Sequence, residues 1–118
     1  MVVEQGQIVE VSYLLPGGRF KVHPALVVSV PELQNEEDGM FYAVLISTEN
    51  IHPQYTIKIE PNWLNRPMEG KSYFVTHIMN YFQVSQITKN TNTFVKKRYL
   101  DPIIAKVINS IFGWEVEV

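Results

Sequence analysis

The sequence predicts a mainly β fold with one C-terminal α-helix, arranged as a small β-barrel that the helix covers. Short apolar segments with strand patterning recur at intervals of about 8–16 residues, and turn residues separate them. Near the end of the chain the apolar spacing changes to the period of an α-helix. The chain has 118 residues, 46% of them hydrophobic, which fits one domain over residues 1–118. We place the barrel at about residues 6–98 and the helix at about residues 100–112.

The strands are predicted from alternation and from β-branched apolar runs. Residues 7–13 alternate, and the sequence Pro-Gly-Gly at residues 16–18 then ends this strand, because these residues favour tight turns. Residues 25–30 are almost continuously apolar and are expected to form a buried strand, which Pro31 ends before an acidic loop. Further strands are predicted at residues 40–47, 55–59, 73–78 and 82–87.

The C-terminal helix is predicted from six apolar residues on one helical face. These residues are Leu100, Ile103, Ile104, Val107, Ile108 and Ile111. Asp101 is expected to cap the N-terminus with Pro102 in the first turn, and Gly113 is expected to form a left-handed C-cap. Because only one convincing helix is present, an all-parallel sheet, which needs several crossover helices, is not expected.

Composition and charge exclude several kinds of protein. The chain has no cysteine, which excludes disulfides, thiolate metal sites and a cysteine nucleophile. The net charge is −2, but residues 1–60 carry −5 (three bases, eight acids) and the remainder carries +3 (seven bases, four acids), so a basic face is compatible with the total. No apolar run approaches the roughly 20 residues that cross a bilayer, and no signal-peptide pattern is present. We therefore expect a cytoplasmic protein that does not enter a membrane.

Two polar clusters beside predicted strands are candidates for binding a phosphodiester. Arg19, Lys21 and His23 share one face if the chain is extended here, as the residue before a proline favours. Cations hold phosphate and imidazole moves protons, although a solvated loop with a half-buried histidine explains the same spacing. Ser47 and Thr48 end the third predicted strand, where hydroxyls either bind phosphate or simply turn the chain.

A third cluster, Lys96, Lys97 and Arg98, is basic and precedes the helix. It is either a surface for nucleic acid or an ordinary solvated face. The three histidines are isolated in sequence, so no metal site is expected. The common nucleotide-binding, zinc-protease and serine-hydrolase motifs are missing from the sequence.

The order of these motifs resembles the MazF/PemK toxin family. Residues 6–11 (GQIVEV) are similar to its G-[DE]-[IV]-x-x-[VA] pattern, and residues 23–29 (HPALVVS) to its R-P-[AV]-[LV]-[VI]-[LV]-S pattern. Residues 43–48 occupy the place of its apolar strand ending in Thr or Ser. Residues 71–81 resemble its later central strand, and the basic stretch with the predicted helix resembles its C-terminal helix. The similarity covers residues 6–113.

The resemblance implies an SH3-like barrel of the MazF/PemK/CcdB-like toxin fold, usually a homodimer. It implies a metal-independent endoribonuclease that cuts single-stranded RNA through the ribose 2′-OH without a cofactor, and a cognate antitoxin as partner. The family's catalytic arginine falls on His23, and its hydroxyl on Ser47 or Thr48. The residues expected to bind RNA or phosphate are Arg19, Lys21, His77, Lys96 and Lys97, with His77 standing where the family often has arginine or lysine.

The histidine at position 23 leaves two functional hypotheses. Arginine is a permanent bidentate phosphate ligand, whereas histidine is charged only part of the time near neutral pH. Either His23 acts as general base or acid, with Arg19 or Lys21 stabilising the developing charge, or cleavage is weakened or lost. In the second case the domain is a module that binds protein or nucleic acid. An unrelated small β-barrel is a third reading of the same patterns.

Overall fold

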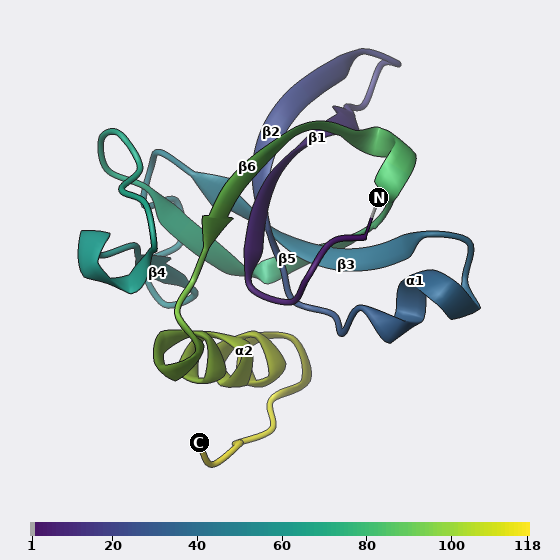
Figure 1. Cartoon of the computed structure of the whole chain (residues 1–118). Helices are drawn as coiled ribbons and strands as arrows, with labels where there is room; N and C mark the ends of the chain where they lie inside the picture. Colours follow the sequence, from purple (N-terminus) through teal and green to yellow (C-terminus); the bar gives the residue numbers. More distant parts are fainter. Residues whose placement is uncertain (1) are drawn as a thin grey trace.

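Six strands form one antiparallel sheet in the order β4-β5-β3-β2-β1-β6 (Figure 1). The computed structural model describes residues 2–118. Its elements are β1 (Gln7–Leu14), β2 (Phe20–Val27), α1 (Glu32–Glu36), β3 (Met40–Ser47), β4 (Thr56–Lys58), η1 (Pro61–Trp63), β5 (Tyr73–Gln83), η2 (Val84–Gln86), β6 (Ile87–Phe94) and α2 (Lys97–Phe112). The predicted fold class, mainly β with a C-terminal helix, is therefore confirmed.

The sheet curls strongly, but within residues 2–118 its edge strands β4 and β6 do not pair with each other (Figure 1). The backbone that follows each edge strand joins them instead. Leu64 forms an isolated antiparallel bridge with Val95, and hydrogen bonds flank this bridge on both sides. The predicted barrel is thus a curled, open sheet held together by a short seam, which comprises residues 63–65 and 94–96.

Side-chain alternation divides the core between the two faces of the sheet. Ile8 and Leu26 are cross-strand partners in the cluster that includes α2, whereas Val9 and Ala25 are partners in the other cluster. The buried residues of the first cluster are Ile8, Leu26, Val28, Val44, Ile46, Ile59, Leu64, Phe74, Val95, Leu100, Ile103 and Val107. Those of the second are Val3, Val9, Val11, Ala25, Val27, Phe41, Ala43 and Phe82. The helix therefore covers one face of the sheet, as its single apolar stripe predicts (Figure 1).

Helix α2 begins at Lys97, earlier than the sequence predicts, and the expected N-cap at Asp101 is wrong. The Lys96 carbonyl accepts the first helical hydrogen bonds, so Asp101 lies inside the helix, where its carboxylate pairs with Lys97 Nζ at 2.7 Å. Pro102 is also internal, and its missing N–H removes one helical hydrogen bond. The apolar helical spacing starts only at Leu100, so the sequence does not indicate that the polar residues before it already belong to the helix. The C-cap is confirmed, because Gly113 ends the helix with φ of 75°.

Three strand boundaries also differ from the prediction. Strand β2 begins at Phe20 rather than at residue 25. Its first half pairs with β1 alone and lacks a buried apolar pattern, so the sequence does not predict it as a strand. Strand β5 is continuous where two strands were expected. The pattern misses most of β6, which is an edge strand composed largely of polar residues. A short helix, α1, occupies the start of the expected acidic loop.

A shift of register within β5 takes His77 out of the regular ladder. Val44 of β3 faces Met79, but Ile46, two residues further on, faces Phe74, so β5 has extra residues in this interval. An irregularity of this kind bends a strand and changes the direction of its side chains. His77 lies within the extra segment.

The His77 ring packs against two other rings. Its centroid lies 4.9 Å from that of His52, with the planes nearly perpendicular at 88°, and 4.6 Å from that of Tyr55. Within the part of the chain that the structure describes, its Nδ1 is buried and has no hydrogen-bond partner. Burial, and secondarily the charge of His52, lower the pKa of His77 below its ordinary value of 6.5.

Ile103→Ala should lower the free energy of unfolding by about 2–5 kcal/mol, because it opens a cavity between α2 and the sheet. Phe112→Ala is the matched control, since Phe112 lies on the same helix but is 59% exposed. It should change the free energy by less than about 0.5 kcal/mol. Urea denaturation measures both values, and equal losses would contradict the packing of α2 on the sheet.

The protein should lose stability as the pH falls below 6.5, because the unfolded chain protonates His77 and the folded chain resists that protonation. This contribution is fully present above the ordinary histidine pKa and decreases towards the lowered pKa of the folded state. His77→Phe should remove it, whereas His52→Gln should remove only the smaller part that comes from charge. Denaturation midpoints between about pH 5 and about pH 8 test this. An undiminished pH dependence in His77→Phe would show that the lowered pKa does not contribute.

Candidate active site

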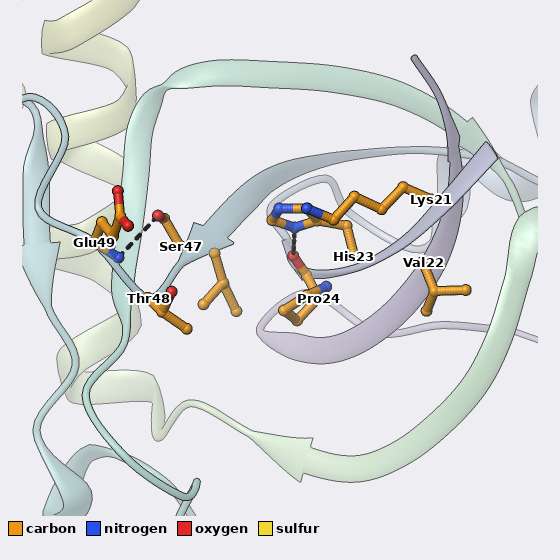
Figure 2. Close-up of a pocket in the computed structure, with 8 residues that line it drawn as sticks. Lys21, Val22, His23, Pro24, Ser47, Thr48 and Glu49 are labelled. Atoms are coloured by element: carbon orange, nitrogen blue, oxygen red, sulfur yellow. Dashed lines mark hydrogen bonds between the residues drawn. The ribbon is translucent and has the colours of Figure 1, made fainter. Parts of the chain in front are cut away.

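A pocket of about 420 Å³ lies where β2 and the end of β3 separate. Its lining residues are Lys21, Val22, His23, Pro24, Ile46, Ser47, Thr48 and Glu49. Figure 2 shows the first four coming from β2, and Ser47, Thr48 and Glu49 coming from the end of β3 and the loop after it. The pocket therefore combines two short stretches that are far apart in sequence.

The pocket opens because β2 pairs with its two neighbours over unequal lengths. It pairs with β1 from Phe20 to Leu26, but with β3 only over Ala25–Val27. The next residue towards the pocket is Pro24, which has no N–H to extend the ladder. Continued by two residues, the register that pairs Ala25 with Leu45 brings His23 opposite Ser47. The pocket thus unites the two residues that the sequence singled out in separate motifs.

The contact of the His23 ring with a backbone carbonyl oxygen favours one tautomer of its imidazole. Its Nδ1 lies 3.1 Å from the carbonyl oxygen of Pro24 (Figure 2). A carbonyl oxygen only accepts hydrogen bonds, so this contact places the hydrogen of a neutral imidazole on Nδ1. The Nε2 atom then carries the lone pair. A partly exposed imidazole in this tautomer can accept a proton from a bound molecule.

Ser47 and Thr48 present hydroxyl groups from the end of β3. The Ser47 Oγ accepts a hydrogen bond from the Glu49 N–H at 3.1 Å, which closes a small turn (Figure 2). The Ser47 O–H remains able to donate to a ligand. Thr48 is exposed, whereas Ser47 is partly buried. The turn therefore fixes the position of the Ser47 oxygen.

The pocket carries one charge of each sign, on Lys21 and on Glu49, and both side chains are exposed. Lys21 can attract an anion such as phosphate, and Glu49 opposes that attraction. No site role for Glu49 is predicted from the sequence. Its place, two residues after Ser47 at a strand end, is the signal that could have included it. Val22, Pro24 and Ile46 also line the pocket, and the sequence reasoning did not assign them to the site.

The remaining predicted site residues lie outside the lining of this pocket. Arg19 is exposed in the turn before β2, where its carbonyl accepts from the Leu15 N–H. His77 belongs to the ring cluster on β5. Lys96 and Lys97 are exposed at the start of α2. The structure thus brings Lys21, His23, Ser47 and Thr48 together and separates the others from them.

Two further properties concern metals and membranes. Among residues 2–118, no three side chains of the His, Cys, Asp or Glu types form a group that could hold a metal ion. No helix in the same range is long and apolar enough to cross a membrane.

Comparison with known proteins connects the chain to others through structure alone. No protein-family model matches the sequence, and no curated protein matches it. Among solved structures, the chain is similar to MazF from Deinococcus radiodurans, with a TM-score of 0.74, 13% identity, and coverage of 97% of this chain and 99% of that one. It is similar to an endoribonuclease from a mycobacterial species, with a TM-score of 0.73, 14% identity, and coverage of 99% and 97%.

A third similar structure is a mycobacterial endoribonuclease in complex with its cognate antitoxin, with a TM-score of 0.69, 16% identity, and coverage of 98% of each chain. These similarities extend over essentially the whole of both chains. The overall folds therefore agree, although the sequence identities are only 13–16%. The chain has the fold of the MazF toxins.

Proposed function

We propose that this protein is a metal-independent endoribonuclease, the toxin of a type II toxin–antitoxin system, and that it cuts single-stranded RNA in the pocket between β2 and β3. The observation that carries the proposal is the position of His23. The contact of its Nδ1 with the Pro24 carbonyl favours a tautomer with the lone pair on Nε2, and Ser47 and Lys21 line the same pocket.

In the proposed reaction, His23 Nε2 takes the proton of a ribose 2′-OH. The 2′-oxygen then attacks the adjacent phosphorus, forms a 2′,3′-cyclic phosphate and displaces the 5′-oxygen of the next nucleotide. That oxygen takes up a proton from water at the open mouth of the pocket. The nucleophile belongs to the RNA itself, so the step uses no cofactor.

Two groups are proposed to stabilise the charge that develops on the phosphate. The Lys21 ammonium and the Ser47 O–H both line the pocket and can donate to the non-bridging oxygens. Thr48 is the alternative hydroxyl. Arg19, Lys96 and Lys97 lie outside the pocket lining. We assign them to neighbouring phosphates of the RNA, because the attraction of a cation to the RNA backbone depends on its charge more than on its exact position.

The wider biological role rests on the similar structures. Among them are MazE–MazF from Deinococcus radiodurans and a mycobacterial endoribonuclease with its cognate antitoxin. By analogy, we propose a cytoplasmic protein that forms a homodimer and is neutralised by an antitoxin protein. The low identity, 13–16%, makes this an argument from fold.

A binding module that does not cut RNA is the second candidate, and Glu49 favours it. Its carboxylate lines the same pocket and disfavours a bound phosphate. Histidine at position 23 also holds phosphate less firmly than arginine would. In this role the pocket binds protein or nucleic acid and releases it unchanged.

His23→Ala should reduce the rate of RNA cleavage by a factor of about 10²–10⁴, because it removes the general base. The measurement is the rate of fragmentation of a long RNA by purified protein in the presence of EDTA. His52→Ala is the control, since it removes an exposed histidine outside the pocket and should leave the rate unchanged. RNA that stays intact with the wild-type protein would favour the binding module.

His23→Arg separates the two possible roles of this position. An arginine holds phosphate but cannot act as a base, so this variant should be as slow as His23→Ala if the mechanism is right. A rate equal to or above that of the wild type would assign the position to phosphate binding instead. Ser47→Ala and Thr48→Val, compared in the same assay, identify the hydroxyl that contributes.

Lys96→Gln should weaken RNA binding and leave the cleavage rate at saturating RNA unchanged, because Lys96 lies outside the pocket. The slope of log affinity against log salt concentration should fall by about 0.7, the value for one phosphate contact on a single strand. Lys97→Gln should have a smaller effect, since Lys97 pairs with Asp101. Filter binding over a salt series measures the slopes. An unchanged slope for Lys96→Gln would remove Lys96 from the RNA surface.

A further inference from the structure

The last five residues have the pattern of a β-strand but no strand partner. Residues 114–118 read WEVEV, so three apolar side chains alternate with two glutamates. This period of two gives an extended chain one apolar face and one acidic face. Within residues 2–118, no backbone hydrogen bond involves this segment, which follows the C-cap of α2. We call residues 114–118 the tail.

The apolar side chains of the tail are left in water. Trp114 is 70% exposed, Val116 41% and Val118 76%. The tail lies loosely along its own helix: Trp114 lies 6.2 Å from Phe112 between ring centroids, and Glu115 and Val116 line an open groove with Ala105, Lys106 and Asn109 of α2. An exposed strand-forming segment of this kind is suited to adding to the edge of another sheet.

The edge of β2 has the complementary pattern. Beyond Ala25, β2 has no pairing with β3 within the described residues, so its backbone over residues 20–24 is free on the side of the pocket. Phe20 is 69% exposed and Val22 52% exposed on one face. Lys21 and His23 lie on the other face, because side chains alternate along a strand, although Val22 lines the same pocket as they do.

The two patterns match residue by residue. When Val116 is placed beside Val22, the glutamates on either side of it fall on the face of Lys21 and His23. This holds in the parallel and in the antiparallel direction, because both segments repeat every two residues. The apolar faces then meet each other, and each acidic side chain meets a basic one.

We propose that the tail of one copy of this chain binds as an added strand along the free β2 edge of a second copy. A five-residue strand spans at most about 18 Å, whereas the molecule measures 31 × 30 × 30 Å. Figure 1 shows the C-terminus beyond α2 and the turn between β1 and β2 at the opposite end of the molecule. A second copy therefore supplies the occupant, and reciprocal exchange of tails gives a two-fold dimer.

The absence of cysteine from the sequence allows a direct test by disulfide trapping in the full chain. Val22→Cys and Val116→Cys proteins, mixed under mild oxidation with glutathione, should form a covalent heterodimer. Val2→Cys, which is 64% exposed, replaces Val116→Cys in the control mixture and should give about tenfold less product. Equal yields in the two mixtures would overturn the proposal. A monomeric disulfide in the doubly substituted chain would show that the tail binds its own β2 instead.

Charge reversal tests whether the glutamates of the tail pair with the basic face of β2. Glu115→Lys with Glu117→Lys should lower the yield of the Val22–Val116 heterodimer about tenfold, because exposed ion pairs become repulsive contacts. Lys21→Glu in the partner protein should restore part of it, and Lys97→Glu, the same change outside the pocket, should not. A heterodimer yield that stays the same in all of these variants would overturn the predicted pairing. The readout does not involve RNA, so a failure of this proposal is distinguishable from a failure of the proposed cleavage, although a bound tail covers Lys21 and His23 and competes with RNA for the pocket.

Discussion

The unequal pairing of β2 is the constraint on which the site depends. One side of this strand is bonded to β1 along almost its full length, and the other side meets β3 for only three residue pairs. A proline stands where the second ladder stops. The strand is therefore held rigidly from one side while its other edge is open, so the pocket has firm walls without a complete sheet around it. Such support is what a small domain needs to keep functional side chains in position.

The helix and the curl of the sheet contribute to the same result. Each face of the sheet has its own buried cluster, and the strand pairs alternate between them. Because β2 supplies residues to both clusters, packing on both faces of the sheet holds it in place, in addition to its hydrogen bonds with β1. His23 and Lys21 then extend from the end of the strand that lies beyond these clusters. The second half of β2 is therefore buried in the core, and its first half is exposed and presents the pocket residues.

The sequence predicts the elements that bury a regular apolar pattern and misses those that do not. Strand β3 matches the predicted range, and α2 ends at the expected glycine. Strand β6 is polar along an edge, and the first turn of α2 is polar as well, so neither carries a periodic signal. That His23 shares a pocket with Ser47 and Thr48 is implied by the resemblance to the MazF/PemK family and agrees with the pocket lining. The separation of His77 from them is not predicted, because it results from extra residues in β5 that only the register reveals.

The seam that joins the sheet edges also sets where α2 begins. The Lys96 N–H donates to the Trp63 carbonyl at 2.8 Å, and the Lys96 carbonyl accepts from the N–H of Leu100 at 3.0 Å. The Trp63 ring stacks on Tyr99 in the first turn of the helix, with 5.7 Å between centroids. One residue thus serves as the last link of the seam and the first acceptor of the helix. We therefore expect local opening of the curled sheet to be coupled to fraying of the first helical turn.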